Sequence, residues 1–366
     1  MEAILAVRLG AMGDVIHALA AVAALRDAFP EARIGWAIDE RWAELLSSPN
    51  ALLCAPGALL SNSEAGPDAP RSAAKPLVDV VHPLDAAAWR AAPLSDETWG
   101  ETVGALRGLR AARYEAAIDF QGLMKSALVA KASSAPVRLG FADPKESAAK
   151  LFYTRAVERT GTHVVEMNLA LAQALTGREA APARFELPRD PGAEAWCDAE
   201  LRRRGAERFL LLVPGGGWGA KLWPAARYGE AARALAADGL RTLVNYGPGP
   251  SEAALAQEVV AASGGAAQPL SCSVSELIAL TRRAQVFLGG DTGPMHLAAA
   301  LGVPVVAVFG PTDPARNGPF GTRSVVLRSA ASQTSYAHGA QVDPGMLEIT
   351  TEEVVAAARR LAREHD

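Results

Sequence analysis

Short apolar runs alternate along the whole chain with longer segments in which apolar residues recur every three or four positions. The short runs have the length of buried strands, and the longer segments have the spacing of amphipathic helices. Strands that alternate with helices favour an α/β fold with a mostly parallel sheet.

The first half is expected to contain four strands and four helices. The strands are predicted over residues 3–8, 33–38, 77–81 and 116–120. The helices are predicted over residues 15–29, 97–112, 126–133 and 164–175. Residues 56–76 are rich in Ala, Pro, Ser and Gly with little periodicity, which indicates a mobile surface loop.

The second half has the same alternation in a more regular form. Its strands are predicted over residues 209–213, 242–246, 285–288 and 305–309. Its helices are predicted over residues 225–237, 251–262, 273–283, 295–301 and 350–363. Two of these helices begin with capping-box spacing, in which a hydroxyl and a carboxylate three residues apart bond each other's backbone N–H. The pairs are Ser273 with Glu276 and Thr350 with Glu353.

Two domains are expected, with the boundary in a segment that carries three prolines among scattered charges. The N-terminal domain is predicted over 1–178, the linker over 179–192 and the C-terminal domain over 193–349. The last helix, 350–366, is expected to pack back on the N-terminal domain.

Composition narrows the class of protein. The 366 residues include 36 Lys and Arg and 40 Asp and Glu, a net charge of −4 that argues against a partner made of nucleic acid. Three widely spaced cysteines exclude a disulfide framework and a cysteine-rich zinc site. No uninterrupted apolar stretch approaches about 18 residues. A cytoplasmic protein is expected, with any membrane contact peripheral.

Four junctions between a predicted strand and the next helix carry candidate chemistry, because ligands of open α/β sheets bind beyond the carboxyl ends of the strands. The first junction, 8–15, has glycines that allow a tight turn and places Asp14 at the start of a helix. Proton abstraction is one use for that carboxylate. The alternative is that Asp14 only caps the helix.

The second junction, 213–224, is rich in glycine and ends in Lys221. Its backbone N–H groups are suited to an anion nest to which Lys221 adds a charge, whereas the alternative is a flexible loop with a solvated lysine.

The third junction, 289–296, offers Asp291 and His296 around a helix start. One alternative is a histidine bonded to a nearby carbonyl. The pair falls short of a zinc site, which needs at least three protein ligands.

The fourth junction, 246–252, places Glu252 just past a strand, where an acidic residue accepts hydrogen bonds from ribose hydroxyls or simply complements the helix dipole.

Other classes of catalytic or binding site are disfavoured. The chain lacks a G-x-G-x-x-G fingerprint after any predicted strand, a G-K-[ST] ending and a G-x-S-x-G elbow. Dinucleotide, P-loop and serine-hydrolase chemistry are therefore less favoured.

Five segments taken together resemble the ADP-heptose:lipopolysaccharide heptosyltransferases of glycosyltransferase family 9. The segments are 12–15 (MGDV), 118–127 (IDFQGLMKSA), 221–224 (KLWP), 291–296 (DTGPMH) and 309–314 (FGPTDP). The resemblance implies the GT-B fold, two Rossmann-like domains that face each other across a cleft. Within the family, the second and fifth segments resemble heptosyltransferase I, and the glycine loop at 215–219 partly resembles heptosyltransferase II.

The resemblance also implies roles for single residues. Asp14 matches the catalytic base, and Lys221 matches the lysine at the donor phosphates. The donor site, including the acid that holds the ribose, is expected to comprise Met12, Gly13, Gly216, Gly217, Lys221, Glu252, Cys272, Asp291, Thr292, Gly293 and His296. Gly216 and Gly217 stand where some relatives have hydroxyl residues, so backbone N–H groups are expected to make those contacts.

The acceptor site is expected to include Arg90, Gln121, Lys125 and Lys145. The implied donor is ADP-L-glycero-D-manno-heptose, the implied acceptor is the Kdo of Kdo-lipid A, and no metal or other cofactor is expected. The implied enzyme is a monomer that acts peripherally on the cytoplasmic face of the inner membrane. Because the net charge is negative, attraction to an anionic glycolipid is expected to come from local Arg and Lys on the N-terminal half. A Rossmann-type NAD(P)-dependent oxidoreductase is the alternative from another class of enzyme.

Overall fold

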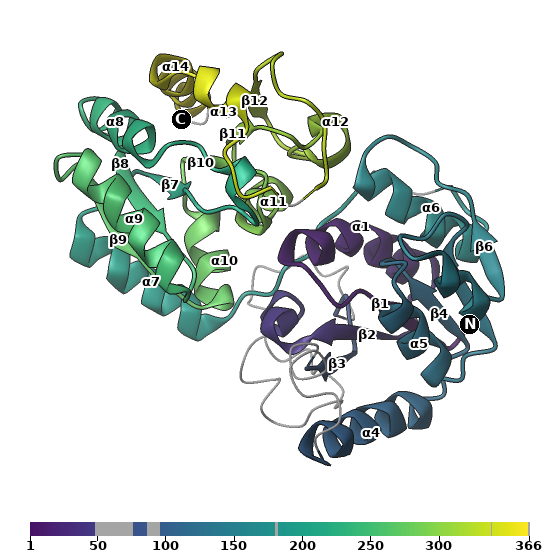
Figure 1. Ribbon diagram of the computed structural model, residues 1–366. Coiled ribbons are helices and arrows are strands. Elements are labelled where there is room, and N and C mark those ends of the chain that lie inside the picture. The colour runs from purple at the N-terminus through teal and green to yellow at the C-terminus, as the bar shows by residue number, and fades with distance from the viewer. Residues whose placement is uncertain (48–75, 86–95, 180–181, 338, 365–366) are drawn as a thin grey trace. The chain divides into compact units, whose positions relative to one another are not determined.

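The computed structural model describes residues 1–47, 76–85, 96–179, 182–337 and 339–364 (Figure 1). The chain divides into two compact units, Met1–Asp190 and Pro191–Asp366. The boundary between them lies inside the predicted linker. Arg90 and nearly all of the predicted loop at 56–76 lie outside the described residues.

The first unit is built on a parallel sheet with the strand order β3-β2-β1-β4-β5-β6. This is the doubly wound Rossmann order, in which the chain reverses its direction across the sheet between β1 and β4. The strands are β1 (Ala3–Val7), β2 (Arg33–Asp39), β3 (Val80–Leu84), β4 (Ala116–Asp119), β5 (Val137–Phe141) and β6 (Arg155–Val157). Every residue of β1 and β4 is buried, as expected for central strands covered on both faces.

Helices cover the sheet of the first unit in two pairs. They are α1 (Met12–Ala28), α4 (Asp96–Ala111), α5 (Met124–Ala132) and α6 (Val164–Thr176), with the 3₁₀ segments η1 (Glu40–Leu45) and η3 (Ser147–Phe152). The helix α1 packs against α6, and α5 packs against both α4 and η3 (Figure 1). The result is a three-layer α/β/α unit.

The second unit repeats the same topology. Its parallel sheet has the order β12-β11-β10-β7-β8-β9, so the reversal falls between β7 and β10. The strands are β7 (Phe209–Val213), β8 (Arg241–Asn245), β9 (Ala267–Leu270), β10 (Val286–Gly290), β11 (Val305–Phe309) and β12 (Ser324–Arg328). Two such Rossmann-like units in one chain confirm the predicted α/β fold class.

The helices of the second unit also lie in two groups, because α8 packs against α9 and α14 while α10 packs against α7 and α11. They are α7 (Pro191–Arg204), α8 (Ala225–Ala236), α9 (Pro250–Ala262), α10 (Val274–Arg282), α11 (Gly293–Ala300), α12 (Pro314–Asn317), α13 (Pro344–Glu348) and α14 (Thr351–Arg363), with the 3₁₀ turn η4 (Gly219–Lys221). Both predicted capping boxes are present, at the starts of α10 and α14.

The last helix packs within the second unit. Its apolar face, which includes Val354, Ala358 and Leu361, is buried in the core of the second unit with Trp223 and Val306. The helix α14 contacts α8, β10, β11 and β12. Its apolar stripe is therefore used within the second unit, and the expectation that the helix also packs back on the first unit stays a prediction.

Among the helices in the described ranges, none is both long enough and apolar enough to span a bilayer.

Candidate active site

Each unit places a cluster of polar side chains where its strand order reverses. Neighbouring loops diverge at such a point and leave room beyond the carboxyl ends of the strands, which is why ligands of doubly wound folds bind there. In the first unit the cluster follows β1 and β4, and in the second it follows β7 and β10.

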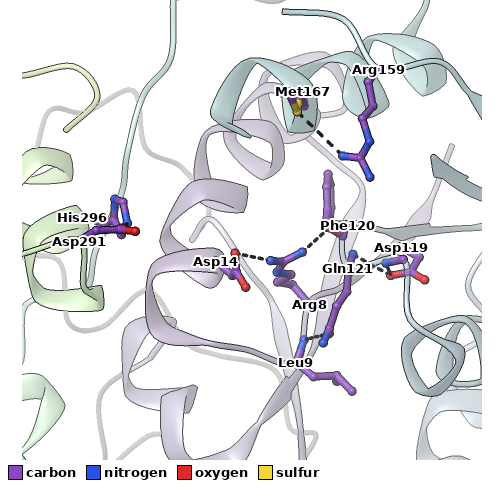
Figure 2. Close-up of polar contacts among 11 residues, drawn as sticks. Arg8, Leu9, Asp14, Asp119, Phe120, Gln121, Arg159, Met167, Asp291 and His296 are labelled. Carbon is purple, nitrogen blue, oxygen red and sulfur yellow. Dashed lines mark hydrogen bonds and ion pairs between the residues drawn. The ribbon is translucent and has the colours of Figure 1, made fainter. Parts of the chain in front are cut away.

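In the first unit, Arg8 holds Asp14. An Nη of Arg8 lies 2.5 Å from Oδ1 of Asp14, and the other Nη donates to the backbone oxygen of Phe120 after β4 (Figure 2). The Arg8 side chain is buried, whereas 34% of the Asp14 side chain is exposed. The carboxylate is thus fixed in orientation from the protein side and remains accessible to a ligand.

The observed geometry decides between the two interpretations of Asp14. The helix α1 begins at Met12, and its N-cap residue is Ala11 rather than Asp14. Asp14 is the third residue of the helix and pairs with Arg8. The interpretation as a cap is therefore wrong, and the role of catalytic base stays a prediction that this geometry favours.

A buried carboxylate, Asp119, organises the neighbouring turn. It accepts hydrogen bonds from the Tyr153 hydroxyl at 2.7 Å, the Ser126 hydroxyl at 2.9 Å and the backbone N–H of Gln121 at 2.8 Å. Burial raises the pKa of the Asp119 carboxyl, and these hydrogen bonds offset part of that rise. Gln121 in turn accepts from the N–H of Leu9 at 3.0 Å, which ties the end of β4 to the end of β1 (Figure 2).

We expect Asp119→Asn to destabilise the first unit by about 2 kcal/mol, because an amide N–H₂ would then face donors that now point at a carboxylate. Any activity that depends on this cluster should fall as well, since the Gln121 turn supports Leu9 and Arg8. Urea unfolding followed by circular dichroism measures the first effect. Asp143→Asn is the matched control, since Asp143 is 65% exposed, and its change should stay within about 0.5 kcal/mol. Equal stability of the two variants would contradict the organising role of Asp119.

In the second unit, Asp291 joins a lysine and a histidine. Its Oδ2 lies 2.6 Å from Nζ of Lys221, and its Oδ1 lies 3.2 Å from Nε2 of His296. Lys221 also lies over the ring of Trp218, 4.4 Å from its centroid. The side chain of Lys221 is only 11% exposed, so the alternative of a solvated lysine on a flexible loop is wrong.

The charges around Asp291 set its protonation state. Burial raises the pKa of this carboxyl, but the hydrogen bond and charge of His296 and the charge of Lys221 outweigh burial and hold the pKa well below its usual range. Asp291 is therefore ionised at neutral pH. It keeps the Lys221 ammonium at the carboxyl end of the sheet, where that cation is available to an incoming anion.

Packing fixes the glycine loop that carries Lys221. The N–H of Ala220 donates to the oxygen of Gly339, and a Cβ on Gly219 would lie 2.1 Å from the oxygen of Ala340. Gly217 is exposed, and Gly216 is half-buried against Leu222. The loop therefore has a fixed course, and contacts from its N–H groups to a phosphate stay a prediction.

The remaining predicted donor residues of the second unit follow neighbouring strands. Glu252 accepts from the N–H of Gly247 after β8 at 2.7 Å, and Cys272 after β9 accepts from the Asn245 amide at 3.2 Å. Burial raises the pKa of the Cys272 thiol to about 12, so it stays protonated. Thr292 is the N-cap residue of α11, and Gly293 is the first residue of that helix. All of these groups lie beyond the carboxyl ends of the strands of this sheet.

The predicted acceptor residues of the first unit lie near one turn. Gln121 is buried, Lys125 is in the first turn of α5, and a Cβ on Gly122 would lie 3.2 Å from the backbone nitrogen of Lys145. Arg90 lies outside the described residues. Met12 and Gly13, predicted for the donor, form the first turn of α1 and are buried. Contact of these residues with a substrate stays a prediction.

The structure adds residues to which the sequence assigned no role. Arg8 lies in the first strand–helix junction and Asp119 in the second motif segment, but the function of Arg8 depends on a partner 112 positions away and that of Asp119 on its burial. Tyr153 lies in no motif. Among the described residues, no group of three or more His, Cys, Asp and Glu side chains is arranged to hold a metal ion.

Comparison with known proteins identifies the family of the chain. Residues 104–342 match the family model described as glycosyltransferase family 9 (heptosyltransferase). A lipopolysaccharide heptosyltransferase 1 from Pseudomonas aeruginosa is 30% identical over 335 residues, which cover 89% of this chain and 83% of the relative. A protein of the same name from Salmonella typhimurium is 27% identical, with 89% and 94% covered.

Solved structures agree on the fold. The E. coli heptosyltransferase WaaC with ADP has a TM-score of 0.74 at 24% identity and covers both chains completely. The E. coli ADP-heptose lps heptosyltransferase II has a TM-score of 0.75 at 20% identity, with 100% of this chain and 99% of that one covered. The family match sets aside the oxidoreductase alternative. The chain belongs to glycosyltransferase family 9, the heptosyltransferases, as its sequence motifs predict.

Proposed function

We propose that this enzyme transfers L-glycero-D-manno-heptose from ADP-heptose to the Kdo of Kdo-lipid A with inversion at the anomeric carbon. The observation that carries the proposal is the pair of clusters at the two strand-order reversals, a fixed and accessible carboxylate in one unit and a buried lysine held by an aspartate in the other. The reaction needs one group of each kind.

The relatives support the choice of donor and, by their names, an acceptor that belongs to lipopolysaccharide. The relatives at 27% and 30% identity are lipopolysaccharide heptosyltransferases 1, and E. coli heptosyltransferase WaaC has been solved with ADP and with ADP-2-deoxy-2-fluoro heptose. For this chain, the ADP part is assigned to the second unit. We assign Glu252, which follows β8, to the ribose hydroxyls, and Lys221 with the N-terminus of α11 to the diphosphate.

The chemistry follows from the two clusters. Asp14 takes the proton of the Kdo hydroxyl while that oxygen attacks the anomeric carbon from the side opposite to ADP. Negative charge then grows on the departing diphosphate. Lys221 and the backbone N–H groups of the Gly216–Gly217 loop stabilise that charge with groups already in place. None of these steps by the chain's own residues requires a metal.

Heptosyltransferase II is the second candidate, since the glycine loop partly resembles that enzyme. Purified enzyme is assayed with ADP-heptose against Kdo-lipid A and against heptosyl-Kdo-lipid A, with ADP release and product mass as readouts. Transfer to the first acceptor alone supports the proposal. Transfer to the second alone identifies the second transferase, and transfer to neither contradicts both candidates. The anomeric configuration of the product, read by NMR, tests inversion.

A further inference from the structure

Two apolar side chains and two lysines are exposed together on the first unit. Leu128 and Lys131 lie one turn apart on α5, and Lys150 and Leu151 are adjacent in η3. The two elements pack against each other. Leu151 is 82% exposed and Leu128 is 48% exposed. These four residues are called the α5–η3 surface here.

The local charge on this part of the chain is opposite to that of the whole. Four of the six lysines fall between residues 125 and 150. Residues 122–160 contain seven Lys and Arg against three Asp and Glu, whereas the remainder of the chain contains 29 against 37. An anionic surface would therefore be attracted here and repelled by the net charge elsewhere.

The acidic side chains near the two lysines bind other partners. Glu146 accepts from the N–H of Met124 at 2.6 Å, and Asp143 pairs with Arg159 at 2.7 Å. Within the part of the chain that the structure describes, neither Lys131 nor Lys150 takes part in an ion pair. Their charges are available to a partner.

The α5–η3 surface is continuous with the cluster that holds Asp14. The N–H of Glu146 donates to the oxygen of Gly122 at 3.0 Å, which joins the segment before η3 to the turn after β4. The same turn carries Gln121, which is bonded to Leu9. A ligand that covers the α5–η3 surface would therefore lie beside the turn that supports the predicted base.

From this arrangement we infer that the α5–η3 surface docks the enzyme on an anionic lipid bilayer. Leu128 and Leu151 enter the region between headgroups and acyl chains, and Lys131 and Lys150 bind lipid phosphates. The inference rests on the proposed function, because an acceptor anchored by acyl chains has to be reached at a membrane surface. An acidic protein would also attract the lysines, but it would not by itself require two exposed leucines beside them.

Vesicle flotation tests the inference with vesicles of phosphatidylglycerol and phosphatidylethanolamine in equal parts and with vesicles of phosphatidylcholine. The full-length enzyme should bind the anionic vesicles and lose that binding as salt is raised. Each lysine at an anionic bilayer changes partitioning on the order of fivefold, so K131Q/K150Q should bind about 25-fold more weakly. Leu151→Ser should bind on the order of tenfold more weakly at every salt concentration, because the apolar contribution is not screened.

The matched control is R202Q/R233Q, which removes two exposed charges from the second unit. This variant should bind vesicles as the unchanged enzyme does. The docking inference is overturned if the unchanged enzyme does not bind anionic vesicles, if it binds phosphatidylcholine equally well, or if both α5–η3 variants bind like the control.

A second assay separates this inference from the proposed function. The α5–η3 variants should transfer heptose to a water-soluble Kdo saccharide without acyl chains at the unchanged rate, and to Kdo-lipid A in anionic vesicles at a reduced rate. An equal loss with both acceptors would overturn docking as the cause. If the unchanged enzyme transfers to neither acceptor, the proposed function fails, and the flotation result still decides whether this surface binds a bilayer.

Discussion

Asp14→Asn should lower the rate of heptosyl transfer by about 10³-fold and leave the affinity for ADP nearly unchanged. The amide keeps the size of the side chain but cannot take the acceptor proton, and general base catalysis contributes roughly 10²- to 10⁴-fold. Asp14 belongs to the first unit, whereas the predicted ADP residues Lys221 and Glu252 belong to the second. Single-turnover rates with saturating donor and calorimetric titration with ADP measure the two quantities separately.

The control for this prediction lies on the same helix. Asp27 is also in α1 and forms an ion pair with Arg184 at 2.7 Å, so Asp27→Asn makes the same chemical change in the same element. Its transfer rate should stay within about twofold of the unchanged enzyme. Normal turnover with weakened ADP binding in Asp14→Asn would assign this residue to the donor site and contradict its role as base.

Hydrophobic periodicity predicted the central elements of each sheet with accuracy that declined toward the sheet edges. The predicted bounds of β7 and β11 coincide with those observed, since both are continuous apolar runs. The strand β9 was missed because Gln268 and Pro269 interrupt its pattern. It lies at a sheet edge, where a proline is tolerated because one side of the strand needs no partner. Of the three other missed strands, β6 and β12 are also edge strands, whereas β5 lies inside the sheet next to β6.

The start of α1 shows a different limit. Gly13 is a poor helix former, so the sequence favoured a loop up to residue 14, whereas the helix begins at Met12. Tertiary contacts override the local preference, because Met12 and Gly13 are buried. The predicted range of β3, 77–81, ends before the observed strand does. The observed strand, Val80–Leu84, includes a proline, a residue that the sequence pattern of a strand disfavours.

The sequence indicated which residues belong to the candidate site, but not which of them contact each other. Motif spacing indicated Asp14, Lys221, Asp291 and His296, but it contains no information on which side chain meets which. Lys221 and Asp291 are 70 positions apart, and the bond from Arg8 to Phe120 spans 112 positions. Such contacts follow from the parallel register of β1 with β4 and of β7 with β10, which brings the loops together.

Lys221→Met should weaken ADP binding at least tenfold and lower kcat by about 10²- to 10³-fold, the usual cost of removing one group that stabilises the leaving charge. The ammonium is desolvated by Trp218 and held by Asp291, so its interaction with a diphosphate is screened less than in water. Methionine preserves most of the side-chain volume and none of the charge. Calorimetry with ADP and transfer kinetics measure both effects.

Two further variants distinguish a catalytic loss from a loss of folding, since removing one partner of a buried ion pair costs about 3 kcal/mol in stability. Lys221→Arg keeps the charge in a broader, forked group, and it should retain ADP affinity within about tenfold while recovering only part of kcat. Lys131→Met makes the same substitution as Lys221→Met on the first unit and should bind ADP normally. If Lys221→Met, shown to be folded by circular dichroism, binds ADP and transfers heptose to the water-soluble Kdo saccharide like Lys131→Met, then Asp291 holds this lysine for stability alone and the leaving diphosphate is neutralised by other groups.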